Sequence, residues 1–575
     1  MAIKMTKPFY KVREFSDLRE LMDMSVDLFG DSYAFEVKRD SGKHYFITYK
    51  DYREEIDALG TALFDLGLAG ERIAIAADNC YEWCLSYMAV VVGGCVVVPT
   101  DKELAAEDIY GILEKSRTKL LFCDRKLLNK LDMSRIPDVK LVCFKQKEDD
   151  EDGVLSFDKL VRRGRELLKA GKDDYLHAEI DPEKMCTLLF TSGTTGTSKG
   201  VMLCQRNFCQ DVLHTMEVVH IDPGDCGLSL LPLHHTYENT IIMFCAPYCG
   251  GKVTFCDGFK YALKNMKEFN PTIFVAVPLI LETVHRRLLK AIKEKPNGEL
   301  KFKIGKALCK AASKVNIDLK KVFFKEIQDA FGGHMRLIIC GGAPIDPQIL
   351  KDFDAFGIQI IFGYGLTECS PLVIINNDRL HLAESVGEPL PGVEAKIDKP
   401  NELGIGEICV RGPMVMLGYY ENEEATREVI DEDGFFHTGD LGRVDSKNHF
   451  YISGRSKNVI VTDNGKNVFP EELEYHLGRH PEVSDSLVYG GKDHKGKLAV
   501  MAKVFPNYSE IKEKLGKQDV SEKEVEEIIQ KAVDDANRAV PSYKRITQFS
   551  IRKTEFIKTT TAKIQRFRKE NLEDK

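Results

Sequence analysis

The sequence lacks the features that mark zinc-stapled, disulfide-bonded or membrane-spanning proteins. Sixteen cysteines are present, but none forms a Cys-x-x-Cys pair, and the close spacings Cys80–Cys84 and Cys245–Cys249 lack zinc partners. We therefore expect reduced thiols and a cytosolic protein. The N-terminal segment has no apolar core of the signal-peptide kind, and the longest apolar run, 88–99, is too short to cross a bilayer.

An excess of positive charge is also missing. The chain has 81 Lys and Arg against 89 Asp and Glu, a formal net charge of -8, so no global charge predicts nucleic-acid binding. An anionic ligand must be met by a local site. With 575 residues, 43% of them hydrophobic, the chain predicts more than one globular domain. We expect a cytoplasmic protein, soluble or at most peripheral at the inner membrane face.

The pattern along the chain predicts an α/β fold. Between residues 72 and 124, short β-branched runs alternate with helical segments, as in a parallel sheet covered on both faces. From Met185 the same alternation returns and predicts a second α/β sheet, beginning with the strand "CTLLF". From about Val386, short strands with glycine and acidic turns predict a small β-barrel or a twisted sheet.

A further change in composition near Arg455 to Lys457 predicts a domain boundary. Beyond it one helix is clearly marked, because Ser521 and Glu524 form a capping box ahead of apolar residues at helical spacing. The predicted fold is a large N-terminal domain, residues 1–455, of two α/β sheets plus a small β-barrel. A small α+β domain follows, residues 456–575.

The stretch "TSGTTGTSKG", Thr191 to Gly200, follows a predicted buried strand. Its glycines free the backbone, and backbone N–H groups and hydroxyls beside Lys199 make a cradle for polyphosphate oxygens. A Walker A loop is excluded, because that motif needs glycine, lysine and a hydroxyl residue in order, whereas here Ser198 precedes Lys199. A plain surface turn is the remaining alternative.

This stretch resembles the phosphate-binding signature of the adenylate-forming superfamily, and further signatures follow in the family's order. They are "LPLHHTYE", "RLIICGGAPID", "FGYGLTECSP", "DGFFHTGDLG", "YISGRSKN", "NGKNVFPEELE" and "TTTAKIQR", so the resemblance covers nearly the whole chain. "GGAPID" and "GEPLPGVEAKI" are closest to long-chain acyl-CoA synthetases. The chain departs from the family at Ser198, where proline is usual, and at Ala562, where glycine is usual.

The resemblance implies five catalytic residues. Lys199 and Lys563 are expected to stabilise phosphate charge, and His235 to lie beside the carboxylate of the acyl substrate. Thr367 is expected to contact the α-phosphate, and Glu368 to be the magnesium ligand. Each residue type also has an ordinary structural role, so order and register along the chain support these assignments.

The resemblance also implies the residues that bind ATP and CoA. The phosphate loop comprises Thr191, Ser192, Gly193, Thr194, Thr195 and Gly196. The adenine site comprises Gly342, Ala343, Tyr364 and Gly365. Asp440, expected to be exposed at a strand end, binds ribose, Arg455 contacts ribose or phosphate, Lys457 is the hinge, and Gly465 lies against the pantetheine chain.

The expected function is ATP- and Mg2+-dependent activation of a medium- or long-chain fatty acid to acyl-AMP, followed by thioester formation with CoA. The C-terminal domain is expected to rotate about the hinge between the two steps. Transfer to an acyl carrier protein, activation of an aryl or amino acid, and a non-enzymatic nucleotide-binding regulator are the alternatives. Oligomeric state is not predicted, and no nucleic acid is expected.

One surface segment suggests a membrane contact. Residues 290–325 hold eleven lysines and three acidic residues, interleaved with apolar residues such as Phe302, Ile304, Leu308 and Phe323. A solvated helical face and a basic amphipathic surface that contacts anionic lipid both fit this pattern.

Overall fold

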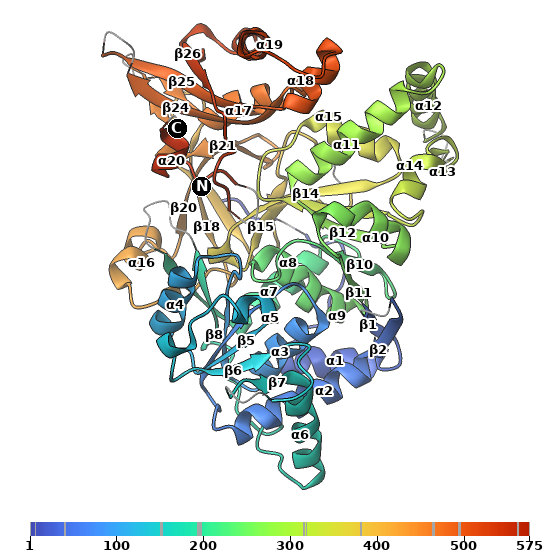
Figure 1. Ribbon diagram of the computed structural model, residues 1–575, viewed down its shortest axis with the longest axis vertical. Coiled ribbons are helices and arrows are strands. Elements are labelled where there is room, and N and C mark those ends of the chain that lie inside the picture. The colour runs from blue at the N-terminus through green and yellow to red at the C-terminus, as the bar shows by residue number, and fades with distance from the viewer. Residues whose placement is uncertain are drawn as a thin grey trace. The chain divides into compact units, whose positions relative to one another are not determined.

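A computed structural model describes most of the chain (Figure 1). The described residues are 2–5, 7–39, 42–149, 153–191, 198–313, 317, 319–379, 382–462, 466–492, 496–559 and 563–573. The chain forms two compact units. The larger unit holds residues 3–394 and 411–434, and the smaller unit holds residues 395–410 and 435–575 with the first two residues. The predicted boundary after Arg455 lies within the smaller unit and stays a prediction.

An eight-stranded sheet, the first sheet, lies in the larger unit in the order β19-β9-β8-β4-β3-β5-β6-β7. Its strands are β3 (Arg72–Ala76), β4 (Val96–Pro99), β5 (Leu120–Cys123), β6 (Lys140–Cys143), β7 (Leu155–Ser156), β8 (Met185–Thr191), β9 (Lys199–Cys204) and β19 (Gly418–Tyr419). Its central strands are parallel, as predicted, because α3 (Tyr81–Val92) and α4 (Ala106–Lys115) make the crossovers. Every residue of α3 is buried.

A nine-stranded sheet, the second sheet, has the order β16-β15-β14-β13-β12-β10-β11-β1-β2. Its strands are β1 (Tyr33–Lys38), β2 (His44–Thr48), β10 (Cys226–Ser229), β11 (Lys252–Phe255), β12 (Ile273–Ala276), β13 (Leu337–Gly341), β14 (Gln359–Gly365), β15 (Leu372–Ile375) and β16 (Glu388–Pro389). The strands from β11 to β14 in this order are parallel.

Each sheet contains strands from both the earlier and the later part of the sequence. This corrects the prediction that the second sheet begins at Met185. "CTLLF" lies in β8, which pairs with β4 and β9 and so belongs to the first sheet. The hairpin β1–β2 belongs to the second sheet through the parallel pair of β1 and β11. β8 was predicted correctly as a strand, whereas the hairpin β1–β2 was not predicted. The sheet that a strand joins depends on partners far away in the sequence.

Helices cover both sheets. The others in the larger unit are α1 (Leu18–Phe29), α2 (Tyr49–Asp65), α5 (Arg125–Leu128), α6 (Phe157–Lys169), α7 (Gln205–Met216), α8 (Thr236–Thr240), α9 (Ala246–Cys249), α10 (Ala262–Phe269), α11 (Pro278–Lys293), α12 (Gly298–Ser313), α13 (Lys320–Phe323), α14 (Lys325–Ala330), α15 (Pro347–Ala355) and α16 (Glu423–Val429). A Cβ at Gly164 of α6 would lie 1.7 Å from a carbonyl oxygen of α2, so this close crossing requires glycine. No described helix is both long and apolar enough to cross a bilayer.

The smaller unit contains a four-stranded sheet of β17 (Glu394–Asp398), β18 (Gly406–Arg411), β20 (Phe436–Val444) and β21 (Phe450–Arg455). Its other strands are β22 (Ile460–Val461), β23 (Asn467–Val468), β24 (Val483–Lys492), β25 (Leu498–Pro506) and β26 (Gln548–Ile551), and its helices are α17 (Pro470–Gly478), α18 (Tyr508–Leu515), α19 (Glu522–Arg538) and α20 (Lys569–Leu572). The predicted helix is confirmed as α19, with Ser521 as its N-cap and a complete capping box.

Candidate active site

Five of the predicted site residues of the larger unit follow parallel strands of the second sheet. The carboxyl ends of β10, β12, β13 and β14 meet at one edge of this sheet, named here the carboxyl edge. His235 follows β10, Gly342 and Ala343 follow β13, and Thr367 and Glu368 follow β14. Open α/β sheets bind ligands at this edge.

The two ends of the predicted phosphate loop lie on paired strands. Thr191 ends β8 and is the register partner of Lys199, which begins β9. The Ser198 hydroxyl donates to the Thr191 carbonyl at 3.1 Å. Both strand ends are therefore fixed by the antiparallel ladder of the first sheet. Predicted loop and pantetheine residues that lie outside the described residues are Ser192, Gly193, Thr194, Thr195, Gly196 and Gly465.

A tyrosine that the sequence analysis missed links Lys199 to Glu368. The ammonium of Lys199 lies 4.5 Å from the centroid of the Tyr419 ring, a cation–π distance. The Tyr419 hydroxyl donates to Glu368 Oε1 at 3.0 Å. β19 places Tyr419 opposite Val201 of β9, and the Met416 N–H donates to the Glu368 carbonyl at 2.8 Å. A cation and a carboxylate expected at the phosphates are thus held together by one aromatic side chain.

His235 is the N-cap residue of α8 and is half-buried. The helix is anchored to the carboxyl edge, because the Tyr237 hydroxyl donates to carbonyl oxygens of β12 and β13 at 3.2 and 2.9 Å. Thr240 donates to the Ser370 carbonyl at 2.9 Å, just beyond the 3-10 helix Thr367–Cys369. The structure therefore brings the His235 helix and the Thr367–Glu368 segment together.

Two ionisable groups near His235 in the chain have shifted pKa values, the half-buried His234 and the buried Glu238. Burial lowers the pKa of His234 to about 4, although Asp101 Oδ2 lies 3.8 Å from its Nε2. Burial raises the pKa of Glu238 to about 8, opposed by hydrogen bonds that include the Leu230 N–H at 3.0 Å. At neutral pH His234 is therefore uncharged and Glu238 is largely protonated, so this part of the edge carries little charge.

Glycines keep the strand ends at the carboxyl edge free of side chains. A Cβ on Gly365 would lie 2.0 Å from the Pro371 carbonyl oxygen, so only glycine fits. Gly342 has φ +88°, which favours glycine, and both Gly342 and Ala343 are exposed. Tyr364, half-buried in β14, lies next to Gly365. Flat backbone beside an aromatic ring suits a planar base, and the adenine assignment stays a prediction.

Asp440 and Arg455 form an ion pair in the smaller unit. They face each other across β20 and β21, with Arg455 Nε 2.9 Å from Asp440 Oδ1. The expectation of an exposed aspartate at a strand end is wrong on both points, because Asp440 lies inside β20 and is 5% exposed. The strand continues past Asp440 because β21 supplies a partner that the local turn pattern did not reveal.

Lys563 belongs to the same unit as Asp440 and Arg455. Its backbone is held by the Thr559 hydroxyl, which accepts from the Lys563 N–H at 3.2 Å. Desolvation and the Arg455 charge lower the pKa of Lys563, while Asp440 acts in the opposite direction. Lys457 lies in the exposed 3-10 helix Ser456–Asn458, directly after β21. Its hinge role stays a prediction.

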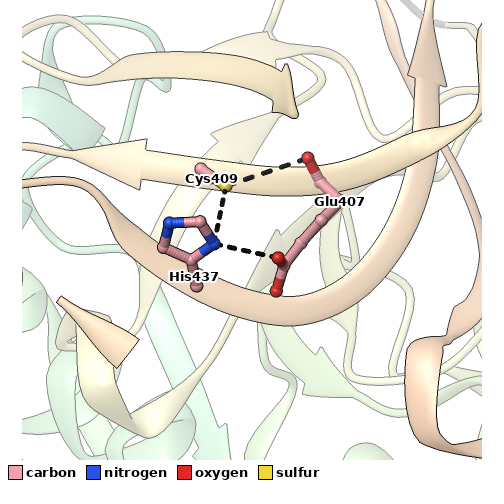
Figure 2. Close-up of side chains that lie close together, drawn as sticks. All are labelled: Glu407, Cys409 and His437. Atoms are coloured by element: carbon pink, nitrogen blue, oxygen red, sulfur yellow. Dashed lines mark hydrogen bonds and ion pairs between the residues drawn. The ribbon is translucent and has the colours of Figure 1, made fainter. Parts of the chain in front are cut away.

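A second group that the sequence analysis missed lies on β18 and β20 (Figure 2). Glu407 and Cys409 of β18 face His437 of β20, and their ligand-type atoms lie within 4.8 Å of one another. His437 Nδ1 lies 2.9 Å from Glu407 Oε2 and 3.4 Å from the Cys409 sulfur. Glu407 Oε1 also accepts the Gly439 N–H at 2.9 Å. These hydrogen bonds fix the backbone that precedes Asp440.

Glu368 fits the expected magnesium site in its chemistry and surroundings. Its half-buried carboxylate supplies hard oxygen ligands at the carboxyl edge, and the Tyr419 hydroxyl orients one of the two oxygens. Magnesium needs few protein carboxylates, because water and phosphate oxygens complete its shell.

Two family models match the chain. Residues 24–420 match the model described as AMP-binding enzyme, and residues 457–573 match the model described as AMP-binding enzyme C-terminal domain. Together these matches include every predicted site residue except Asp440 and Arg455, which fall between them.

Several acyl-CoA synthetases and CoA ligases resemble the chain over most of its length. Long-chain-fatty-acid–CoA ligase FadD15 of Mycobacterium bovis is 30% identical over 89% of this chain and 88% of its own. Long chain acyl-CoA synthetase 7, a peroxisomal protein of Arabidopsis thaliana, is 28% identical over 80% of this chain and 69% of its own. The crystal structure of the anthranilate CoA ligase AuaEII with anthranoyl-AMP has a TM-score of 0.76 at 22% identity and covers 97% of both chains. That likeness establishes the two-domain fold.

Proposed function

Because the chain belongs to the family of AMP-binding enzymes, we propose that it activates a fatty acid with ATP and transfers the acyl group to CoA. In the first step a carboxylate oxygen of the acid bonds to the α-phosphorus of ATP, and the bond to pyrophosphate breaks. In the second step the CoA thiol attacks the carbonyl of acyl-AMP, and AMP leaves. The protein is thus an AMP-forming acid–thiol ligase.

The observation that carries this proposal is the linked group of Lys199, Tyr419 and Glu368. Adenylation requires little covalent chemistry from the protein, so its rate depends on alignment and on charge placed at the phosphates. Tyr419 holds the Lys199 ammonium at a fixed place, and Thr367 begins the turn that carries Glu368. Mg2+ bound to Glu368 would neutralise phosphate charge in this step.

The surroundings of His235 favour an acid with an apolar chain. His235 follows β10, which lies between β11 and β12 in the sheet. Large apolar side chains are exposed beyond both neighbours: Phe259 and Tyr261 follow β11, and Leu279 follows β12. The protonated Glu238 and the neutral His234 add little charge to this region. An acyl chain placed here would leave its carboxylate near His235.

The contribution of Lys563 is expected to be limited to the first step. The substitution Lys563→Ala should lower acyl-AMP formation from palmitate and ATP at least a hundredfold, because the cation at the transferring phosphate is lost. Conversion of presupplied palmitoyl-AMP and CoA to palmitoyl-CoA should stay within about threefold of the wild type. The two half-reactions are measured separately, by pyrophosphate release and by thioester formation.

Lys553→Ala is the matched control for this variant, because Lys553 is a surface lysine of the same unit, paired with Glu522 at 2.6 Å. It should leave both half-reactions unchanged. Equal loss of both half-reactions in Lys563→Ala would contradict the assigned role.

The substrate is tested with a panel of acids. Pyrophosphate release is measured with palmitate, benzoate and amino acids, with and without CoA. The proposal expects release with palmitate and thioester only when CoA is present. Release with benzoate alone would favour an aryl-CoA ligase, and acyl-AMP that CoA does not consume would favour an acyl carrier protein as the acceptor.

A further inference from the structure

Helix α12 carries an apolar stripe on its exposed face. Leu300, Ile304 and Leu308 recur every four residues and are 59%, 48% and 44% exposed. Side chains four residues apart lie on the same helical face. Phe302 and Cys309 lie on the opposite face and pack into the core around β12 and β13. The helix is therefore apolar on two faces, of which only one is covered by the larger unit.

Polar contacts fix which face of α12 points outward. Lys306 of α12 makes an ion pair with Asp352 of α15, whose other oxygen lies 2.9 Å from His285 Nε2 of α11. Asp352 is buried, and although burial acts against it, these two partners keep the pKa of Asp352 below its usual value. Rotation of α12 to bury its stripe would take the Lys306 cation away from this buried carboxylate and leave it with His285 and Gln348 alone, which is costly. The stripe is thus held toward solvent.

The stripe continues onto α13, which lies beside α12 (Figure 1). A Cβ on Gly305 would lie 3.7 Å from Phe323, so Phe323 packs against α12 while remaining 45% exposed. Val322 is 73% exposed. We name Leu300, Ile304, Leu308, Val322 and Phe323 the apolar ridge. With Ile317, the segment from Leu300 to Phe323 holds six of the twenty exposed large hydrophobic side chains of the described residues.

Exposed lysines flank the apolar ridge. Lys301 lies on one side of the α12 stripe, and Lys303 and Lys310 lie on the other. Within the described part of the chain, Lys301 and Lys303 make no ion pair, unlike Lys306 and Lys320, which pair with α15. The whole chain carries a net charge of -8, so this positive region is local. Its arrangement complements an anionic, apolar partner.

We propose that the apolar ridge and its flanking lysines dock onto an anionic lipid membrane. A bilayer surface offers phosphate groups to the lysines and, just beneath them, acyl chains to the ridge. This proposal rests on the proposed function for its purpose, because a fatty acid partitions into membranes. α11, which packs against α12, begins at Pro278, directly after the carboxyl end of β12. The docking surface therefore belongs to the connection between β12 and β13, which leaves the sheet at the carboxyl edge.

Vesicle binding tests the proposal on the full-length protein. Co-sedimentation is measured with vesicles of phosphatidylcholine alone and with vesicles that contain 30% phosphatidylglycerol. The wild type should bind the anionic vesicles at least tenfold more tightly, and added salt should weaken this binding. The triple variant Leu300→Gln, Ile304→Gln, Leu308→Gln should have an affinity for these vesicles at least tenfold lower. Glutamine preserves the helix, but its side chain does not insert into the acyl-chain region.

The double variant Lys301→Gln, Lys303→Gln should bind the anionic vesicles more weakly, with an affinity about fivefold lower for each lysine removed. Its matched control is Lys523→Gln, Lys531→Gln, which removes the same charge from exposed positions of α19 and should bind as the wild type does. For the ridge, the control is Tyr45→Gln, Phe46→Gln on β2, where two exposed aromatic side chains are removed. Equal binding of the triple variant and the wild type would overturn the proposal.

Other occupants of the ridge give different results. If the ridge joins two copies of this chain, the wild type sediments as a dimer, the triple variant as a monomer, and neither binds vesicles; this outcome overturns the proposal. The vesicle assay contains no ATP, acid or CoA, so its result is independent of turnover. Adenylation of octanoate in free solution should be unchanged in the triple variant. If the wild type binds vesicles but does not adenylate octanoate, the result contradicts only the proposed function.

Discussion

Tyr419 joins two charged groups that come from different sheets. Its ring lies under Lys199 of the first sheet, and its hydroxyl holds Glu368, which follows the second sheet. The proposed adenylation step needs both groups at the same phosphates. A single aromatic side chain can position both because it carries a π face and a hydroxyl donor.

The substitution Tyr419→Phe separates these two contacts. The ring remains, so the affinity for ATP should change little, whereas the hydrogen bond to the Glu368 carboxylate is lost. A hydrogen bond to a charged group contributes about 1.5 kcal/mol or more, so half-saturation by Mg2+ should need about tenfold more metal. Pyrophosphate release titrated with Mg2+ at saturating ATP measures this change.

Tyr419→Leu is the companion variant, because it removes the ring as well and should also raise the ATP concentration needed for half-saturation. An unchanged Mg2+ requirement in Tyr419→Phe would show that the hydroxyl does not orient the metal ligand.

Glu238 should make the larger unit less stable as the pH rises. Burial raises its pKa to about 8, above the value of about 4.3 expected in the unfolded chain. Between these values the folded state binds more protons than the unfolded state, so the free energy of unfolding falls with rising pH. This group alone should remove about 2 kcal/mol between pH 6 and pH 8.

Glu238→Gln should abolish that part of the pH dependence, because the amide resembles the protonated acid and can still accept the Leu230 N–H. Urea unfolding followed by fluorescence measures it, and the single tryptophan, Trp83, is buried in the larger unit and so reports on that unit. Identical slopes against pH in the variant and the wild type would mean that Glu238 is already ionised in the folded state.

At the scale of elements, α19 shows how a local pattern defines a helix. The Ser521 hydroxyl lies 2.8 Å from Glu524 Oε2, and that carboxylate also accepts the Ser521 N–H at 2.9 Å. Ser521→Ala should cost about 1 kcal/mol, which corresponds to about fivefold less protection from hydrogen exchange over the first turns. Ser521→Asp should retain the protection, since aspartate also caps helices. Mass spectrometry of peptides from residues 522–538 measures both variants, and unchanged exchange in Ser521→Ala would refute the role of the cap.

Local patterns predicted such elements well, but not their partners. Ser521 and Glu524 lie three residues apart, so their contact is visible in the sequence. β8 was predicted as a strand because its apolar run is local, yet its sheet was assigned wrongly because pairing with β4 depends on long-range packing. Tyr419 was missed for the same reason: only β19 pairing with β9 brings it to Lys199. Asp440 was expected to be exposed because the local turn pattern does not reveal that β20 pairs with β21. This pairing buries Asp440.

At the scale of the whole molecule, the expected cations belong to separate compact units. Lys199 lies in the larger unit, and Lys563 lies in the smaller unit with Arg455 and Asp440. The proposed adenylation step requires both lysines to act on one nucleotide. Chemical labelling of amines tests this requirement directly, because a bound nucleotide hides the lysines that contact it.

Lys563 should react with acetic anhydride at pH 8 faster than Lys301, although both residues are exposed. Desolvation and the Arg455 charge lower the pKa of Lys563, so more of its amine is unprotonated and nucleophilic. Arg455→Gln should slow its labelling, since the neighbouring positive charge is lost. ATP with Mg2+ should protect Lys199 and Lys563 together, at the same half-saturating ATP concentration, while Lys301 stays unprotected. Quantitative mass spectrometry measures all three rates in one sample. If ATP protects Lys199 but not Lys563, the two lysines do not contact the same nucleotide, and the proposed role of Lys563 in adenylation is wrong.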